Sequence, residues 1–203
     1  MMARSSLRGL GRRGFTLVEM LMVLLIMAVL AALAIRPLLL GRSLNVTTAG
    51  NQVMEDLAYA RELAIANNQP VEVWFLRPNG GTLLTGLQLC LVDSTGNSNA
   101  YGGVFRLPAP IGIDSGTTLS PLFNSNNKKT FGAQPFIPGY GTNYDAWFMR
   151  FMPDGSPYLK TVPTQIFLTL HDVTPGDQLT TLPTNYAVIS IDPVAGSVSL
   201  YRP

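Results

Sequence analysis

Cysteine and histidine are almost absent from this chain of 203 residues, which contains one of each, Cys90 and His171. A single cysteine excludes an intrachain disulfide even in an oxidising compartment, so stability must come from core packing, assembly or both. Cys90 lies in the apolar run of residues 87–92, where we expect a small buried hydrophobic residue. A zinc site needs more histidine or cysteine ligands than the chain offers.

Motifs of catalysis are also lacking. His171 ends the alternating run of residues 165–170, a position typical of a polar residue at the end of a strand. A catalytic triad would need this histidine beside a nucleophile and an acid, and no G-x-S-x-G motif occurs. We therefore predict no catalytic residues, no metal, no cofactor and a protein that is not an enzyme.

One loop does carry closely spaced oxygen ligands. Residues 93–99 read Asp-Ser-Thr-Gly-Asn-Ser-Asn, a set of oxygen atoms that suits calcium. The EF-hand pattern fails here, because its closing glutamate would fall at Val104. We expect a solvated turn, with calcium binding as the alternative.

The chain contains one long run that is both apolar and uncharged, residues 20–35. It follows Arg12-Arg13-Gly14-Phe15-Thr16-Leu17-Val18-Glu19. A helix over residues 15–35 has about 21 residues and a length of roughly 30 Å, which matches the hydrocarbon core of a bilayer. The positive-inside rule then places the amino terminus in the cytoplasm. The residues that decide this orientation are the basic ones before the run: Arg4, Arg8, Arg12 and Arg13.

Glu19 is the unusual residue of this segment. A carboxylate at the centre of a membrane helix costs about 2.5 to 3.5 kcal/mol and generally marks a function. The position of Glu19 close to the cytoplasmic end lowers this cost. Thr16-Leu17-Val18-Glu19 also matches a capping box, in which Glu19 bonds a first-turn amide beside the positive end of the helix dipole.

Two plainer interpretations of the segment stay open. The first is a conventional secretory signal, for which Ala32-Leu33-Ala34 would supply the small-residue cleavage site and Ile35 the mature terminus. The second is an amino-terminal membrane anchor that is not cleaved.

A third interpretation comes from a resemblance. Gly14-Phe15-Thr16-Leu17-Val18-Glu19 after a basic leader resembles the prepilin signal of type IV pilins and type II secretion pseudopilins. The resemblance implies that a prepilin peptidase cleaves between Gly14 and Phe15 and N-methylates Phe15. It also implies that Glu19 pairs with the terminal amine of a neighbouring subunit during assembly. Such pairing accounts for a costly acid, because opposite charges attract strongly at low dielectric.

Loss of the leader changes the charge of the protein. The formal net charge of +2 includes four leader arginines, and without them ten Lys and Arg face twelve Asp and Glu, a balance of −2. Attraction to nucleic-acid phosphates therefore has no global support. Some FimT-like pilins nevertheless resemble DNA-uptake components. The candidate DNA contacts are Lys128, Lys129 and Arg202.

The helix is predicted to continue as an amphipathic stem to about residue 66. We expect Pro37 to kink or punctuate this stem, and Gly41 and Gly50 to weaken the segment between. Asn67-Asn68-Gln69-Pro70 should end it. The apolar positions that recur at helical spacing are Val53, Leu57, Ala60 and Ala64.

Beyond residue 68 the pattern is typical of strands and turns. Residues 94–145 are expected to be loops with one short strand at 103–107. One long helix followed by several short strands predicts an α+β fold, in which the amino-terminal helix packs on an antiparallel sheet. The predicted strands cover residues 71–76, 82–93, 146–152, 165–171, 185–191 and 197–201.

The order of these elements narrows the resemblance. The helix-to-strand junction at residues 60–71, Phe151-Met152-Pro153-Asp154-Gly155 and the closing hairpin are similar to FimT/GspH-like (H-type) minor pseudopilins. The resemblance implies a single-pass protein of the bacterial inner membrane that joins other pilins or pseudopilins near the tip of a filament. A DNA-binding uptake pilin of a competence type IV pilus is the alternative. The implied parts are a leader at 1–14, a stem helix at 15–67 with a transmembrane segment at 15–35, and a periplasmic β-rich domain at 68–203.

Overall fold

The computed structural model describes the backbone of residues 16–203, and the side chains of residues 16–30 and 45–203. The chain divides into two compact units, Met1–Gly41 and Arg42–Pro203. The predicted leader, with Gly14 and Phe15 at the cleavage site, lies outside the described residues.

A single helix, α1 (Leu17–Asn67), occupies 51 residues. Its helical backbone continues through Pro37, Gly41 and Gly50, so none of these residues interrupts the stem, and a kink at Pro37 stays a prediction. The predicted end is confirmed, because Asn68 takes a left-handed φ of 48° directly after the last helical residue. Its amide donates to the Ile65 carbonyl at 3.2 Å, which closes the last turn.

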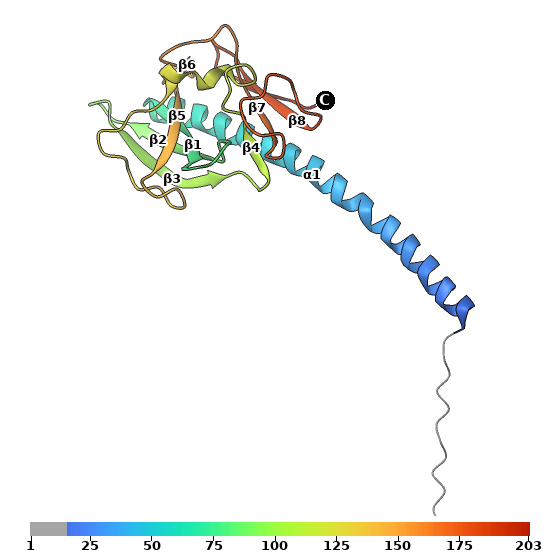
Figure 1. Ribbon diagram of the computed structural model, residues 1–203. Helices are drawn as coiled ribbons and strands as arrows, with labels where there is room; N and C mark the ends of the chain where they lie inside the picture. Colours follow the sequence, from blue (N-terminus) through green and yellow to red (C-terminus); the bar gives the residue numbers. More distant parts are fainter. Residues whose placement is uncertain (1–15) are drawn as a thin grey trace, which may run out of the picture. The chain divides into compact units, whose positions relative to one another are not determined.

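The second half of α1 buries one face completely. The four apolar positions predicted from helical spacing, at residues 53, 57, 60 and 64, are confirmed as core positions. Ala49 and Val46, one and two turns earlier, belong to the same buried face. These six side chains have no exposed surface: Val46, Ala49, Val53, Leu57, Ala60 and Ala64. Figure 1 shows this part of the helix running against the strands of the second unit.

Two antiparallel sheets, rather than one, accompany the helix, and the α+β class is confirmed. The five-stranded sheet has the order β3-β2-β1-β5-β6 and the four-stranded sheet the order β4-β7-β8-β9. The predicted hairpins are both present, as the pairs β1–β2 and β8–β9. The strands are β1 (Val71–Pro78), β2 (Gly86–Val92), β3 (Ser98–Arg106), β4 (Ile111–Ile113), β5 (Tyr144–Phe151), β6 (Pro157–Tyr158), β7 (Ile166–Asp172), β8 (Tyr186–Ile191) and β9 (Val198–Tyr201).

One main core joins both sheets to the helix. Alternate residues of the central strands point into it, for example Val73 and Phe75 of β1 and Leu168 and Leu170 of β7. The opposite face of β1 is also buried, and there Trp74 belongs to a second, smaller cluster. Strand β1 is therefore covered on both faces, which explains the run of apolar and aromatic residues from Val73 to Leu76.

The prediction that residues 94–145 are loops is wrong in part. Strand β3 begins at Ser98 rather than residue 103, and β4 and two short 3-10 helices, Pro121–Phe123 and Ser125–Asn127, follow it. Strand β3 forms one edge of its sheet and is largely exposed, so it needs no apolar alternation. Its backbone ladder with β2 holds it in place.

Gly50 is a close-contact position rather than a weak point of the helix. A Cβ atom there would lie 3.0 Å from Leu200 Cδ1 and 3.5 Å from Ala187 Cβ. Gly50→Val is therefore expected to lower the free energy of unfolding by about 1–3 kcal/mol through overpacking. Chemical denaturation of the full chain in detergent micelles measures the change. The matched control is Thr48→Val at an exposed position of the same helix, expected to change stability by no more than about 0.5 kcal/mol. Equal effects of the two substitutions would contradict the packing account.

Candidate functional site

The first turn of α1 forms the predicted capping box. The Glu19 amide donates to Thr16 Oγ1 at 3.3 Å, and the Thr16 amide donates to Glu19 Oε2 at 3.4 Å. Both bonds are longer than a typical 2.9–3.0 Å contact. Glu19 is exposed, so its carboxylate is held at the start of the helix yet remains accessible to another molecule.

An apolar surface follows Glu19 on every side of the helix. All the described side chains of residues 16–30 are exposed, including Leu17 at 78% and Met27 at 65%. A surface of this kind marks contact with a membrane or with other proteins. Among the residues with described side chains, no helical stretch is long and apolar enough to cross a bilayer. The predicted transmembrane segment at 15–35 includes Phe15 and residues 31–35, which lie outside that set.

The comparison that decides the nature of this terminus is a match to a protein family. Residues 10–35 match the family described as "Prokaryotic N-terminal methylation motif". The chain carries a prokaryotic N-terminal methylation motif. The motif spans Arg12 and Arg13, the Gly14–Phe15 bond, Glu19 and the apolar run. The resemblance of the amino terminus to type IV pilins and pseudopilins is thereby confirmed.

Solved structures similar to this chain include two of the minor pseudopilin EpsH from the type II secretion system of Vibrio cholerae. The first shares 11% identity with this chain and the second 12%, and their TM-scores are 0.45 and 0.46. Each match covers 78% of this chain, together with 98% of the first EpsH chain and 97% of the second. The type IV minor pilin FimU of Pseudomonas aeruginosa PAO1 shares 14% identity over 78% of this chain and 87% of its own, with a TM-score of 0.44. No curated protein matches the chain in sequence. Because these identities and TM-scores are low, the methylation motif is the stronger evidence for the resemblance.

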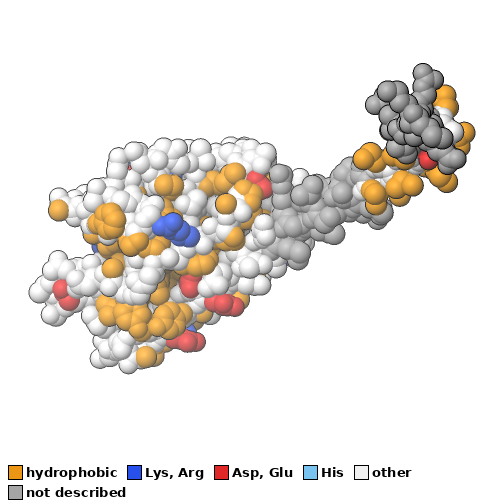
Figure 2. All heavy atoms as spheres, turned by 90° about the horizontal axis from the view of Figure 1, so that it is seen from below, with side chains coloured by type: hydrophobic (Ala, Val, Ile, Leu, Met, Phe, Trp, Pro, Cys, Tyr) orange, Lys and Arg blue, Asp and Glu red, His pale blue; other side chains and the backbone are white. Residues whose placement is uncertain are grey.

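The three candidate DNA contacts are already engaged in contacts within the protein. Lys128 Nζ lies 2.7 Å from Asp145 Oδ1, and Lys129 Nζ lies 2.6 Å from Glu72 Oε2. Arg202 belongs to a different part of the fold, where its guanidinium donates to Thr47 of α1 and to the backbone carbonyl at the start of β8. On the face shown in Figure 2, Lys and Arg side chains form no continuous patch.

The partner of Lys129 is a buried acid that the sequence pattern did not single out. The side chain of Glu72 has no exposed surface and accepts four bonds on its two oxygens, two of them from cations. Burial alone would raise the pKa of Glu72. The hydrogen bonds from the four donors outweigh burial and lower the pKa to about 2. The network joins β1, β3, β5 and the segment before β5. Its donors are Lys129 Nζ at 2.6 Å, Arg150 Nη2 at 2.6 Å, Ser98 Oγ at 2.6 Å and Trp74 Nε1 at 2.9 Å.

Cys90 is buried as the sequence predicts, and the predicted turn at residues 93–99 ends at Asn97, because β3 begins at Ser98. Cys90 is fully buried, and burial raises the pKa of its thiol well above the ordinary range. The Asp93 carboxylate accepts bonds from the amides of Thr95 and Asn97, both at 2.9 Å, within an exposed turn. The Thr95 hydroxyl, which donates to Asp93 Oδ1 at 2.6 Å, lowers the pKa of Asp93 most, and the two amides lower it further. Among the described residues, no group of three or more His, Cys, Asp or Glu side chains is placed to hold a metal ion.

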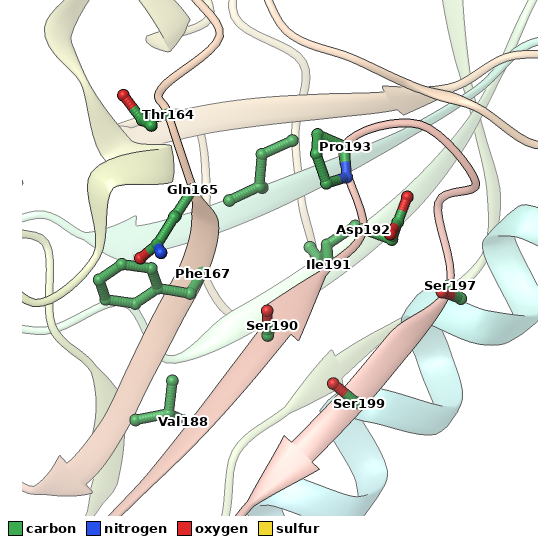
Figure 3. Close-up of a pocket in the computed structure, with 11 residues that line it drawn as sticks. Thr164, Gln165, Phe167, Val188, Ser190, Ile191, Asp192, Pro193, Ser197 and Ser199 are labelled. Atoms are coloured by element: carbon green, nitrogen blue, oxygen red, sulfur yellow. The ribbon is translucent and has the colours of Figure 1, made fainter.

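A groove of about 560 Å³ lies over β7, β8 and β9, and Figure 3 shows the side chains that line it. Its one carboxylate, Asp192, accepts amide bonds from Val194 at 2.8 Å and Ala195 at 2.6 Å. The carboxylate therefore organises the turn between β8 and β9. The other polar lining residues are Thr164, Gln165, Ser190, Ser197 and Ser199.

Proposed function

We propose that this protein is a minor pilin-like subunit of a type II secretion pseudopilus or a type IV pilus. The observation that carries the proposal is the N-terminal methylation motif at residues 10–35. In this role the chain acts through assembly rather than catalysis. Its partners are the prepilin peptidase, the inner membrane before assembly, and other pilins or pseudopilins afterwards.

The motif assigns chemistry to three residues in this proposal. The peptidase cleaves the bond between Gly14 and Phe15, and the new amine of Phe15 is methylated. Glu19 then pairs with the terminal amine of a neighbouring subunit. The exposed position of Glu19 at the first turn of α1 supports this role, since a second chain can reach its carboxylate.

Residues 15–35 hold the subunit in the inner membrane until it assembles, with the amino terminus in the cytoplasm and residues 68–203 in the periplasm. Assembly replaces lipid contacts by contacts between equivalent helices. Small residues favour such contacts, because they let helices approach closely. The sequence provides them at Ala28, Ala31, Ala32 and Ala34.

The finer assignment is an H-type minor subunit located near the filament tip. It is supported by the order of the elements, a single long helix followed by antiparallel hairpins, and by the three downstream stretches that resemble H-type subunits. A DNA-binding uptake pilin is not favoured. Lys129 is bound to a buried carboxylate and Lys128 to Asp145, so a phosphate would have to compete with a carboxylate at each side chain.

Crosslinking in the native membrane tests the proposal. A photoreactive residue at an exposed position of the apolar run, such as Leu24, should capture pilins or pseudopilins when the filament motor is active. The same probe at Glu62, on the exposed face of the periplasmic part of α1, is the matched control. Capture of only lipid by Leu24 in a strain that assembles filaments would refute assembly, and the identity of the captured subunits separates secretion from pilus machinery.

A further inference from the structure

His171 lies in a buried ionic cluster that the proposed assembly role does not use. The side chains of His171 and Asp114 have no exposed surface, and His171 Nε2 lies 3.2 Å from Asp114 Oδ2. His171 Nδ1 lies 2.6 Å from the carbonyl oxygen of Asp172. Both ring nitrogens therefore face oxygen acceptors. A neutral imidazole has one N–H and can satisfy only one of them, whereas the imidazolium satisfies both.

Asp114 is the hub that connects this histidine to two loops. Its Oδ1 accepts the Gly116 amide at 2.7 Å, and its Oδ2 accepts the Leu179 amide at 3.1 Å. The Asp114 carboxylate therefore bonds one backbone amide from each of the two loops. The same two loops meet a second time, where Asp177 accepts the Ser115 amide at 2.7 Å.

We infer that His171 is a pH-responsive clasp, which in its protonated form fastens the segment of residues 173–185 to the loop after β4 and releases it on losing its proton. The segment connects β7 to β8. Loss of the proton leaves Asp114 as a buried carboxylate without its cation, which is costly in a dry interior. The cost is relieved when the Gly116 and Leu179 amides separate and water reaches the carboxylate.

Opening of the clasp changes a cavity of about 400 Å³ beside it. Ser115 and Gly116 line this cavity from one loop and Gln178 from the other, while Arg77 and Trp147 form another part of its wall. A change in the protonation of His171 would thereby change the shape of the surface around this cavity.

The surroundings of His171 are acidic on balance. Its neighbour on β7 is Asp172, the loop after β4 supplies Asp114, and the segment after β7 supplies Asp177. Arg77 of β1 lies 3.8 Å from Asp177 and offsets part of that charge. The facing positions of the flanking strands are held by Gly112 of β4 and Tyr186 of β8.

The sign of the pH effect follows from these contacts. Burial lowers the pKa of His171, but the bonds to Asp114 and to the Asp172 carbonyl outweigh it, so the pKa is raised above its ordinary value of 6.5. The clasp is therefore fully closed below pH 6.5 and opens as the pH rises through the folded-state pKa. For each unit by which the pKa is raised, the closed form gains about tenfold in population.

The chain's single histidine makes the test direct. NMR of the full chain in detergent micelles, carrying a tag without histidine, gives the titration of His171 from one Cε1–H signal. Hydrogen exchange, corrected for intrinsic base catalysis, follows the Leu179 and Gly116 amides over the same pH range. We expect His171 to titrate above pH 6.5 and the protection of both amides to fall across that titration.

The Thr161 amide, which bonds the uncharged Asn127 side chain at 2.8 Å, is the internal control and should stay constant. His171→Gln should remove the pH dependence of Leu179. If that variant does not fold, the unsubstituted chain decides the question alone. A His171 that titrates below pH 6.5, or a constant protection of Leu179 through the titration, would overturn the inference.

Discussion

Glu19→Ala is expected to be processed normally and yet to be absent from filaments. The substitution leaves Gly14 and Phe15 in place, so cleavage continues. It removes the proposed acceptor for the terminal amine of the next subunit. Breaking one partner of a buried ion pair costs about 3–5 kcal/mol, which corresponds to a loss of at least about a hundredfold in association. Immunoblots of sheared filaments and of the membrane fraction measure incorporation.

The capping box makes a second variant decisive. Glutamine serves in a capping box as glutamate does, so Glu19→Gln keeps the bonds with Thr16 but removes the charge. If Glu19 acts through its charge, Glu19→Gln fails to assemble just as Glu19→Ala does. Normal assembly of Glu19→Gln would refute the pairing account and leave the helix cap as the function of this residue. Glu62→Ala, at an exposed position of the same helix, is the control and should assemble normally.

Glu72→Ala is expected to destabilise the compact unit Arg42–Pro203 by about 3–5 kcal/mol. The variant leaves Lys129 and Arg150, both largely buried, without their shared anion. It also removes the ion pair between β1 and the segment before β5. Urea denaturation of the full chain in micelles should show a lower midpoint, with Glu62→Ala unchanged as the control. A midpoint equal to that of the parent chain would show that the network contributes nothing to stability.

The same network predicts loss of stability in acid. The pKa of Glu72 is lowered from 4.5 to about 2, so its contribution is fully present above pH 4.5 and is lost as the pH falls through about 2. The difference corresponds to about 3 kcal/mol. Unfolding curves at several pH values between 5 and 2 should show this decline, and Glu72→Gln should flatten it. An equally steep decline in the Gln variant would assign the acid sensitivity to other carboxylates.

Local sequence patterns predict the helix and the two hairpins, because the contacts that form them join residues that are close in sequence. The buried face of α1 follows from apolar residues at helical spacing, and the hairpins β1–β2 and β8–β9 follow from short apolar runs beside turn residues. Strand β3 was missed in part because an exposed edge strand has no reason to alternate. Gly50 was misjudged because its role depends on Leu200, which is distant in sequence.

The ionic sites show the same limit more sharply. Glu72 meets Lys129 across 57 residues and Arg150 across 78, and no short motif signals either contact. His171 meets Asp114 across 57 residues, and the alternating run before it predicts only a polar strand end. The amino-terminal site differs, because Gly14, Phe15 and Glu19 form one contiguous motif. The motif at residues 10–35 can therefore be recognised from the sequence alone, and the roles of the three residues are predictions that follow from it.

The mature amino terminus tests the central claim most directly. Mass spectrometry and terminal sequencing of the protein from native membranes should find a chain that begins at Phe15 and carries one additional methyl group on its terminal amine. The same protein should keep Met1 and its leader when the prepilin peptidase is absent. A mature chain that begins at Ile35, or one that keeps its leader while the peptidase is active, would contradict assignment to a pilin-like filament.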